Sequence, residues 1–244
     1  MGLLRAELIE LAKILNNIKK PSVLMIGRQD IIAQLYDIKQ LMEEFCIQFD
    51  YSGETEDDID AYKFFYALGA KEVHALDFSD YEGADIIFDL NSTEGMPSEL
   101  YEHYDLVIDG GVLEHIFRPD VGIKNISNMV KPQGYIYHML PCGGLINHGF
   151  YSFSPMFFTE YYQYPFWIVS NIRLQYKPER GMYKFVFYSM DCRFFLDQEG
   201  FNKYVSNYWN HGGEIMIQCI CQKQITGGIS EVPIQDIYKE LVEE

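Results

Sequence analysis

The beginning of the chain shows two hydrophobic patterns. Apolar residues recur at helical spacing from Leu4 to Ile18, with charged residues between them. The stretch Ser22–Gly27 (SVLMIG) is then continuously apolar and stops at a glycine, as a buried parallel strand does. The patterns predict an opening packing helix followed by the first strand of a sheet.

The alternation of helix and strand patterns continues as far as residue 109. Helical periodicity returns between Ile31 and Phe45, and a further short helix, ended by Gly69, follows an acidic loop at Glu54–Asp58. Three more apolar runs each end in an aspartate: Glu72–Phe78 with Asp77, Ala84–Asp89 with Asp89, and Tyr104–Asp109 with Asp109. Strands interleaved with helices predict a doubly wound, mainly parallel sheet, with a ligand crevice at the carboxyl ends of its strands.

The second half of the chain changes character after one more helix and strand. Pro119 suits the first turn of a helix, and Gly134–Leu140 has the pattern of a fifth strand after a turn at Lys131–Gly134. A loop at Pro141–Gly149 follows. The remaining predicted elements are a helix at Met156–Tyr162, strands at Trp167–Tyr176, Tyr183–Tyr188 and Glu214–Gln222, a turn at Lys177–Gly181, and a short helix from about Pro233.

Composition supports one α/β domain. The 244 residues are 48% hydrophobic, enough to bury a full core. We divide the domain into an N-terminal helix (1–20), a core (21–140) and C-terminal strands with a cap (141–244). Aromatic residues make up 16% of the chain and crowd between Phe150 and Trp167, so we expect a ring-lined cap on the acceptor side.

Net charge and cysteine spacing indicate which classes of ligand the protein can bind. The net charge of −17 argues against nucleic acid, because such binding depends on cationic contacts to phosphate. We therefore expect a small-molecule or glycan-type acceptor. The five cysteines show no paired metal spacing, and Cys219 and Cys221 should be reduced thiols on one strand face. We expect no metal site, no membrane span and a cytoplasmic protein, and a homo-oligomer is left open.

The motifs at the strand ends resemble those of class I S-adenosylmethionine-dependent methyltransferases. The resemblance covers about Pro21 to Leu140 and rests on five stretches: Val23–Gly27, Asp77, Asp89–Asn91, YDLVIDGGVLEHI (Tyr104–Ile116) and VKPQG (Val130–Gly134). More loosely, Asp77–Asn91 and Asn147–Pro155 look like the methyltransferase-like proteins of bacterial polysaccharide clusters. The resemblance implies a seven-stranded Rossmann-like methyltransferase fold and S-adenosylmethionine as cofactor.

The resemblance also assigns cofactor-binding residues. Asp77 would accept hydrogen bonds from the ribose hydroxyls, and Phe78 would flank the adenine. Asp89 or Leu90 would meet the adenine edge, and Gly110 would let the backbone approach the sulfonium. The remaining candidates are Asp109 and the first-loop residues Gly27, Arg28 and Gln29.

The first loop departs from the family pattern. The family has two or three glycines there, whereas Gly27 is followed by Arg28, Gln29 and Asp30, which crowds the approach of backbone to a ligand. Either Arg28 pairs with the cofactor carboxylate, or it is a solvent-facing turn residue. A nicotinamide cofactor is disfavoured, because Asp77 follows Gly27 much later than the ~20 residues of that fingerprint.

Two histidines are candidates for acid–base catalysis. His115 begins the element after the fourth strand, where Glu114 could orient it, and His148 lies in the loop after the fifth strand. The leading hypothesis is methyl transfer to a hydroxyl or amine of a sugar, nucleotide-sugar or small polar metabolite in surface-glycan synthesis. The alternatives are a non-catalytic binding or scaffolding relative, with a crevice filled by Arg28 and Gln29, and another nucleoside-handling enzyme.

Overall fold

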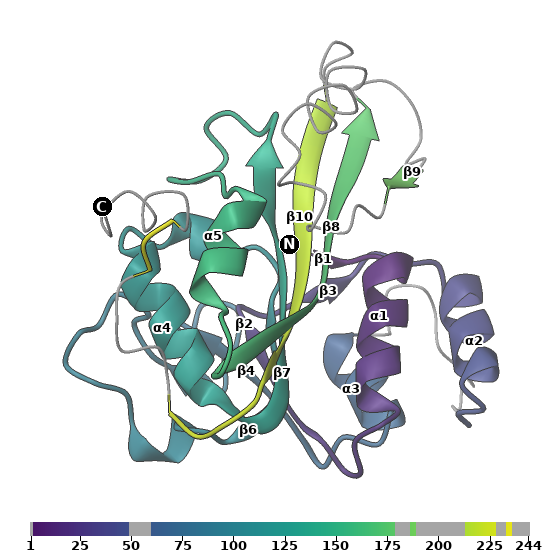
Figure 1. Ribbon diagram of the computed structural model, residues 1–244. Coiled ribbons are helices and arrows are strands. Elements are labelled where there is room, and N and C mark those ends of the chain that lie inside the picture. The colour runs from purple at the N-terminus through teal and green to yellow at the C-terminus, as the bar shows by residue number, and fades with distance from the viewer. Residues whose placement is uncertain (1, 49–59, 179–185, 189–212, 228–232, 236–244) are drawn as a thin grey trace.

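The computed structural model describes residues 2–48, 60–178, 186–188, 213–227 and 233–235 (Figure 1). A central eight-stranded sheet has the order β5-β4-β2-β6-β7-β10-β8-β9. Its strands are β2 (Ser22–Ile26), β4 (Glu72–Asp77), β5 (Ile86–Ile87), β6 (Tyr104–Asp109), β7 (Val130–Gly143), β8 (Trp167–Pro178), β9 (Val186–Tyr188) and β10 (Gly213–Lys223).

The sheet is doubly wound around β2, which pairs in parallel with β4 on one side and β6 on the other. The parallel part continues to β5 and β7. Only then does β10 insert antiparallel between β7 and β8, and β9 adds a short edge strand. This order confirms the predicted doubly wound, mainly parallel Rossmann-like sheet, with eight strands in place of the expected seven because β9 adds at the edge. It places a topological switch point between the ends of β2 and β6.

Helices cover both faces of the sheet (Figure 1). Successive residues of β2 point to opposite faces of the sheet. Val23 and Met25 belong to a buried cluster with residues of α1, α2 and α3. Leu24 and Ile26 belong to a second cluster with residues of α4 and α5. The helices are α1 (Arg5–Leu15), α2 (Leu35–Glu44), α3 (Ala61–Ala67), α4 (Pro119–Met129) and α5 (Pro155–Tyr161). None of the described helices has the length and apolar character of a bilayer span.

Several local predictions differ from the structure. Asp30–Ile31 is strand β3, which pairs with β1 (Gly2–Leu3), so α2 begins later than the periodicity suggested. Pairing with the chain terminus overrides the local pattern there. The predicted turn at Lys131–Gly134 is part of the long strand β7, and Gln133 has a positive φ of 66°. The acidic loop and most of the predicted C-terminal helix lie outside the described residues.

Candidate functional site

Three strand ends meet at the switch point. Ile26 and Asp109 are paired neighbours in the sheet, and Asp109 is in turn paired with His138. Gly27 follows β2 with a φ of +69°, and a Cβ added there would lie 3.0 Å from Val112 and 4.0 Å from the Asp77 carboxylate. Glycine therefore permits both the left-handed turn and the close approach of these neighbours.

The side chain of Gln29 occupies the space above Gly110. It is 3% exposed, and its Nε2 donates to the carbonyl oxygens of Ile26 at 3.2 Å and Gly27 at 3.3 Å. A Cβ on Gly110 would collide with the Gln29 amide. The amide oxygen Oε1 has no hydrogen-bond partner among the described residues. The expected crevice between the ends of β2 and β6 is thus occupied by a side chain with a buried, unsatisfied acceptor.

Arg28 points away from this crevice. Its guanidinium donates to the carbonyl oxygen of Glu82 at 3.2 Å, lies 3.6 Å from the Asp60 carboxylate and stands 5.5 Å over the ring of Tyr62. Of the two side chains expected to fill the crevice of a non-catalytic relative, only Gln29 does so.

The residues predicted to bind the nucleoside part of the cofactor differ in how far they are already engaged. Within the described residues, Asp77 Oδ1 accepts a single long bond, from the Ser79 amide at 3.3 Å, and Phe78 is 72% exposed. Asp89 is more engaged, because its Oδ1 accepts from the backbone and side-chain amides of Asn91 at 2.8 and 3.0 Å. Leu90 is buried in the core. Among these candidates, Asp77 and Phe78 are therefore the most available to a ligand.

Asp109 belongs to a buried hydrogen-bond chain that the sequence did not reveal. Its Oδ2 lies 2.9 Å from His138 Nδ1, and the other imidazole nitrogen lies 2.7 Å from the Tyr162 hydroxyl. Oδ1 accepts from the amides of Val112 and Leu113 at 3.0 and 3.3 Å. The only signal for this chain is the register of β6 and β7, which sets Asp109 beside His138.

The two predicted catalytic histidines converge on Glu114 in the short 3₁₀ helix η2 (Leu113–His115). His148 Nε2 lies 3.5 Å and His115 Nε2 lies 3.9 Å from Glu114 Oε1, and the two imidazole centroids are 5.1 Å apart. The Glu114 side chain is 0% exposed, against 46% for His115 and 35% for His148. Burial, and after it the charge of Asp109, raises the pKa of Glu114 to about 8.

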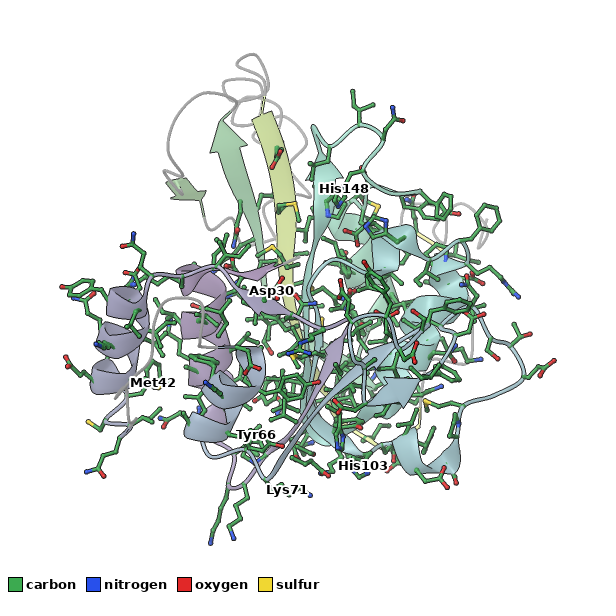
Figure 2. The ribbon with its side chains drawn as sticks, turned by 180° about the vertical axis from the view of Figure 1, so that it is seen from behind. Asp30, Met42, Tyr66, Lys71, His103 and His148 are labelled. Carbon is green, nitrogen blue, oxygen red and sulfur yellow. The ribbon has the colours of Figure 1, made fainter. Side chains whose placement is uncertain are left out.

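The backbone fixes this convergence. The bonds from Asp109 to the amides of Val112 and Leu113 hold the start of η2. The loop after β7 folds back so that the Phe150 amide donates to the Glu114 carbonyl at 2.8 Å. A Cβ on Gly149 would lie only 2.8 Å from that oxygen, so glycine allows the approach. Figure 2 shows His148 at the end of the sheet opposite Lys71 and His103.

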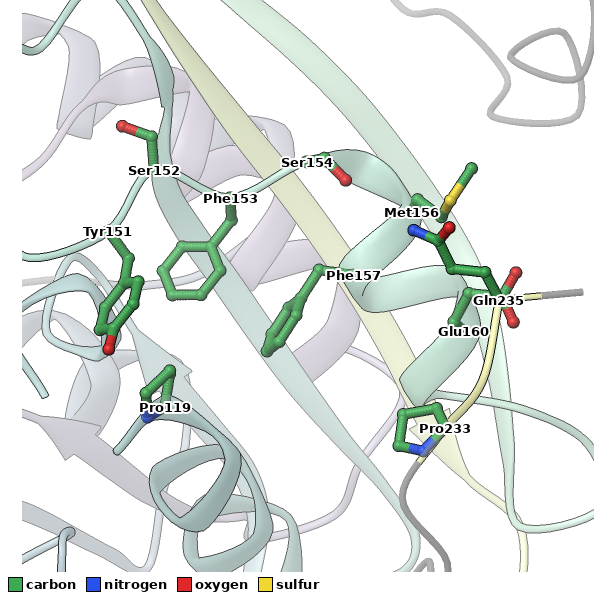
Figure 3. Close-up of a pocket in the computed structure, with 10 residues that line it drawn as sticks. All are labelled: Pro119, Tyr151, Ser152, Phe153, Ser154, Met156, Phe157, Glu160, Pro233 and Gln235. Carbon is green, nitrogen blue, oxygen red and sulfur yellow. The ribbon is translucent and has the colours of Figure 1, made fainter. Parts of the chain in front are cut away.

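A ring-lined cavity of about 430 Å³ lies beside this loop (Figure 3). The rings of Tyr151, Phe153 and Phe157 face it, and Pro119 and Pro233 close other sides. Tyr151 connects the cavity to η2, because its amide donates to the Glu114 carbonyl at 3.3 Å. The aromatic stretch predicted to form a cap therefore lines a cavity, and Tyr151 in its wall is bonded to the backbone of Glu114.

Comparison with solved structures returns several proteins that are described as methyltransferases. TehB from Haemophilus influenzae matches with 14% identity and a TM-score of 0.43, over 90% of this chain and 62% of that one. A putative methyltransferase from Bacillus halodurans matches with 8% identity and a TM-score of 0.49, over 91% and 99%. A SAM-dependent methyltransferase from Archaeoglobus fulgidus matches with 12% identity and a TM-score of 0.45, over 90% and 92%.

The chain thus spans less than two thirds of the Haemophilus structure. All three TM-scores lie below 0.5, and the fold assignment therefore rests on the strand order. No family model and no curated protein matches the sequence.

Proposed function

We propose that the protein is an S-adenosylmethionine-dependent methyltransferase acting on a hydroxyl or amine of a sugar, nucleotide-sugar or other small polar metabolite, in surface-glycan synthesis. The observation that carries the proposal is the arrangement at the carboxyl ends of β2, β4 and β6. Gly27 and Asp77 adjoin there, Gly110 on the next strand admits the close approach of the Gln29 amide, and His115 and His148 converge on Glu114. Ligands of doubly wound sheets bind at such a switch point.

The residues at the crevice fit such a cofactor in their donor and acceptor character. Asp77 has carboxylate capacity left for ribose hydroxyls, since it accepts one long bond from the part of the chain that the structure describes. The unpaired Oε1 of Gln29 is an acceptor for an ammonium group, and it faces Gly110. When bound, the cofactor supplies an activated methyl group on a sulfonium. The protein then has to align the acceptor and remove its proton.

Alignment is the larger of these two tasks. Well-oriented reactants recover about 7–11 kcal/mol of a barrier, whereas general base catalysis of about 10²- to 10⁴-fold corresponds to about 3–5 kcal/mol. The cavity lined by Tyr151, Phe153 and Phe157 would align the acceptor through ring contacts. His148 or His115 would accept the proton, because both imidazoles are partly exposed and lie next to the Glu114 carboxylate.

Calorimetry with S-adenosylmethionine and S-adenosylhomocysteine tests the proposal directly. Wild-type protein should bind both, and absence of binding up to millimolar concentrations would reject the cofactor. Asp77→Ala should abolish binding while the protein stays folded, and Asp80→Ala, in the adjoining turn, is the matched control. Wild-type affinity in folded Asp77→Ala protein would reject the ribose role.

Turnover on candidate acceptors tests the histidines. His148→Ala should lower turnover on nucleotide-sugars with labelled cofactor and leave cofactor affinity unchanged. Unchanged turnover on the true acceptor would remove His148 from the reaction.

A second candidate function, a non-catalytic binding or scaffolding protein, is favoured by one observation: Gln29 fills the space above Gly110. Gln29→Ala decides between the two. If the glutamine blocks the crevice, the variant will bind S-adenosylhomocysteine and the wild type will not. If the glutamine serves the cofactor, the wild type will bind and the variant will bind more weakly.

A further inference from the structure

Glu114, His115 and His148 have the composition of a metal site. One potential ligand atom from each side chain lies within 4.8 Å of the other two. The residues come from two segments, η2 and the loop after β7, that the backbone bonds to the Glu114 carbonyl hold together. The cluster is thus preorganised by structure outside its own side chains.

The spacing suits shared coordination better than direct hydrogen bonding. The two N–O distances, 3.5 and 3.9 Å, exceed the ~2.7–3.2 Å of N–H···O bonds. Two atoms that each lie ~2.0–2.2 Å from one zinc ion, at a tetrahedral angle, are ~3.3–3.6 Å apart. A small shift of the exposed His115 ring would bring both nitrogens into that range.

Burial gives an independent reason to expect a cation. The Glu114 side chain is 0% exposed, and neither carboxylate oxygen has a hydrogen-bond partner among the described residues. A buried carboxylate without partners costs several kcal/mol, and such groups are normally paired or coordinate metals. The half-exposed imidazoles lie on the open side of this carboxylate and would leave coordination positions facing solvent.

The donor set selects the kind of metal. Two imidazoles and one carboxylate suit zinc and neighbouring transition metals, whereas magnesium prefers oxygen ligands alone. Three protein ligands with a free position is the arrangement of catalytic zinc sites. We infer that Glu114, His115 and His148 bind one divalent transition-metal ion of the zinc type, with one coordination position left open for an exchangeable ligand.

The role of this ion rests on the proposed methyl transfer. A hydroxyl oxygen of the acceptor would occupy the open position, and the cation would stabilise the alkoxide so that the proton leaves to water. The imidazoles would then act as ligands and not as free bases. Metal binding itself does not depend on this role.

Metal analysis of tag-free protein, stripped with a chelator and dialysed against Zn²⁺, tests the site. We expect one zinc ion per chain, tighter binding of Zn²⁺ than of Mn²⁺ or Mg²⁺ in calorimetry, and a higher Tm with Zn²⁺. Glu114→Gln, His115→Ala and His148→Ala should each weaken Zn²⁺ binding by more than about 100-fold, because changes in outer-shell residues alone cost about 10- to 100-fold.

His103→Ala is the matched control, since this exposed histidine also pairs with a glutamate, Glu72, but at the opposite end of the sheet. It should bind zinc like the wild type. Absence of zinc binding, equal binding by all four variants, or tighter Mg²⁺ than Zn²⁺ binding would overturn the inference. The two histidine variants change partly exposed side chains and should remain folded. They therefore test the site even if Glu114→Gln fails to fold.

A separate calorimetric arm with S-adenosylhomocysteine keeps the two proposals apart. Zinc bound at these residues without cofactor binding would support the metal site and reject the proposed function. Cofactor binding without zinc would reject the metal site alone.

Discussion

Two polar clusters at opposite ends of the central sheet differ in whether their carboxylate has partners. At the amino end, Asp105 Oδ2 accepts from the Ser22 amide at 2.8 Å, the Ser22 hydroxyl at 2.7 Å and Lys131 Nζ at 2.9 Å. At the carboxyl end, Glu114 is more deeply buried, yet its oxygens have no hydrogen-bond partner in the described part of the chain. Figure 2 marks these ends by His103 and His148.

The difference distinguishes Asp105, which stabilises the fold, from Glu114, which within the described residues has acceptor atoms free to bind a ligand. Asp105 joins the first residues of β2 and β6 to β7, and its Oδ2 accepts three hydrogen bonds from within the protein. Glu114 and Gln29 leave acceptors unsatisfied beside the switch point. Since stability favours satisfied polar groups, the unsatisfied ones point to function.

The largest effect on the free energy of unfolding is expected at Asp109, which is fully buried and paired with His138. Asp109→Ala removes the partner of His138 and of two backbone amides. We expect the free energy of unfolding to fall by about 3–5 kcal/mol, as for other broken buried pairs, measured by urea denaturation. Asp89→Ala, which removes the two local bonds that Asn91 donates, should cost less. A loss below about 1 kcal/mol for Asp109→Ala would contradict the structural role.

A smaller loss is expected from Asp105→Asn. Hydrogen bonds to charged groups contribute about 1.5–3 kcal/mol, and the amide retains part of that, so we expect a loss of about 1–2 kcal/mol at pH 7. Bonds from Ser22 and Lys131 outweigh partial burial and hold the pKa of Asp105 below its usual value of 3.8.

The pH dependence of Asp105 follows from this lowered pKa. Its contribution is present above the unfolded pKa and is lost as pH falls through the lower folded pKa. The Asp105→Asn variant should therefore differ most from the wild type near neutral pH and converge with it in acid. Urea midpoints measured across the acid range check this, and a constant difference would contradict it.

The smallest effect, and one of opposite sign, is expected from Glu114→Gln in metal-free protein. Because burial raises the pKa of Glu114 to about 8, the side chain must take up a proton on folding near pH 7. An amide of the same shape is neutral in both states, so the free energy of unfolding should rise by about 1 kcal/mol. Urea denaturation in the presence of a chelator measures it. A loss similar to that of Asp105→Asn would show that Glu114 has partners and would remove the contrast between the two clusters.

The sequence predicted the sheet and the strand ends because local patterns set them. Gly27 and Asp77 lie at the carboxyl ends of β2 and β4, as expected. The two histidines selected from the sequence, His115 and His148, both lie close to Glu114. The link between Asp109 and His138 was missed because it depends on the register of two strands. The position of Gln29 over Gly110 depends on the conformation of one side chain in the folded protein. A pattern of hydrophobic and polar residues carries no information on it.

The chain from Asp109 through His138 to Tyr162 has a consequence for how the molecule opens. It joins β6 and β7 to the residue that ends α5, and the Tyr162 hydroxyl also lies 3.4 Å from Ser127 of α4. Segments tied in this way unfold together as one cooperative unit. Amide hydrogen exchange should therefore be slow and concerted across β6, β7 and α5, so the wall of the aromatic cavity and the floor of the site would lose protection in a single event.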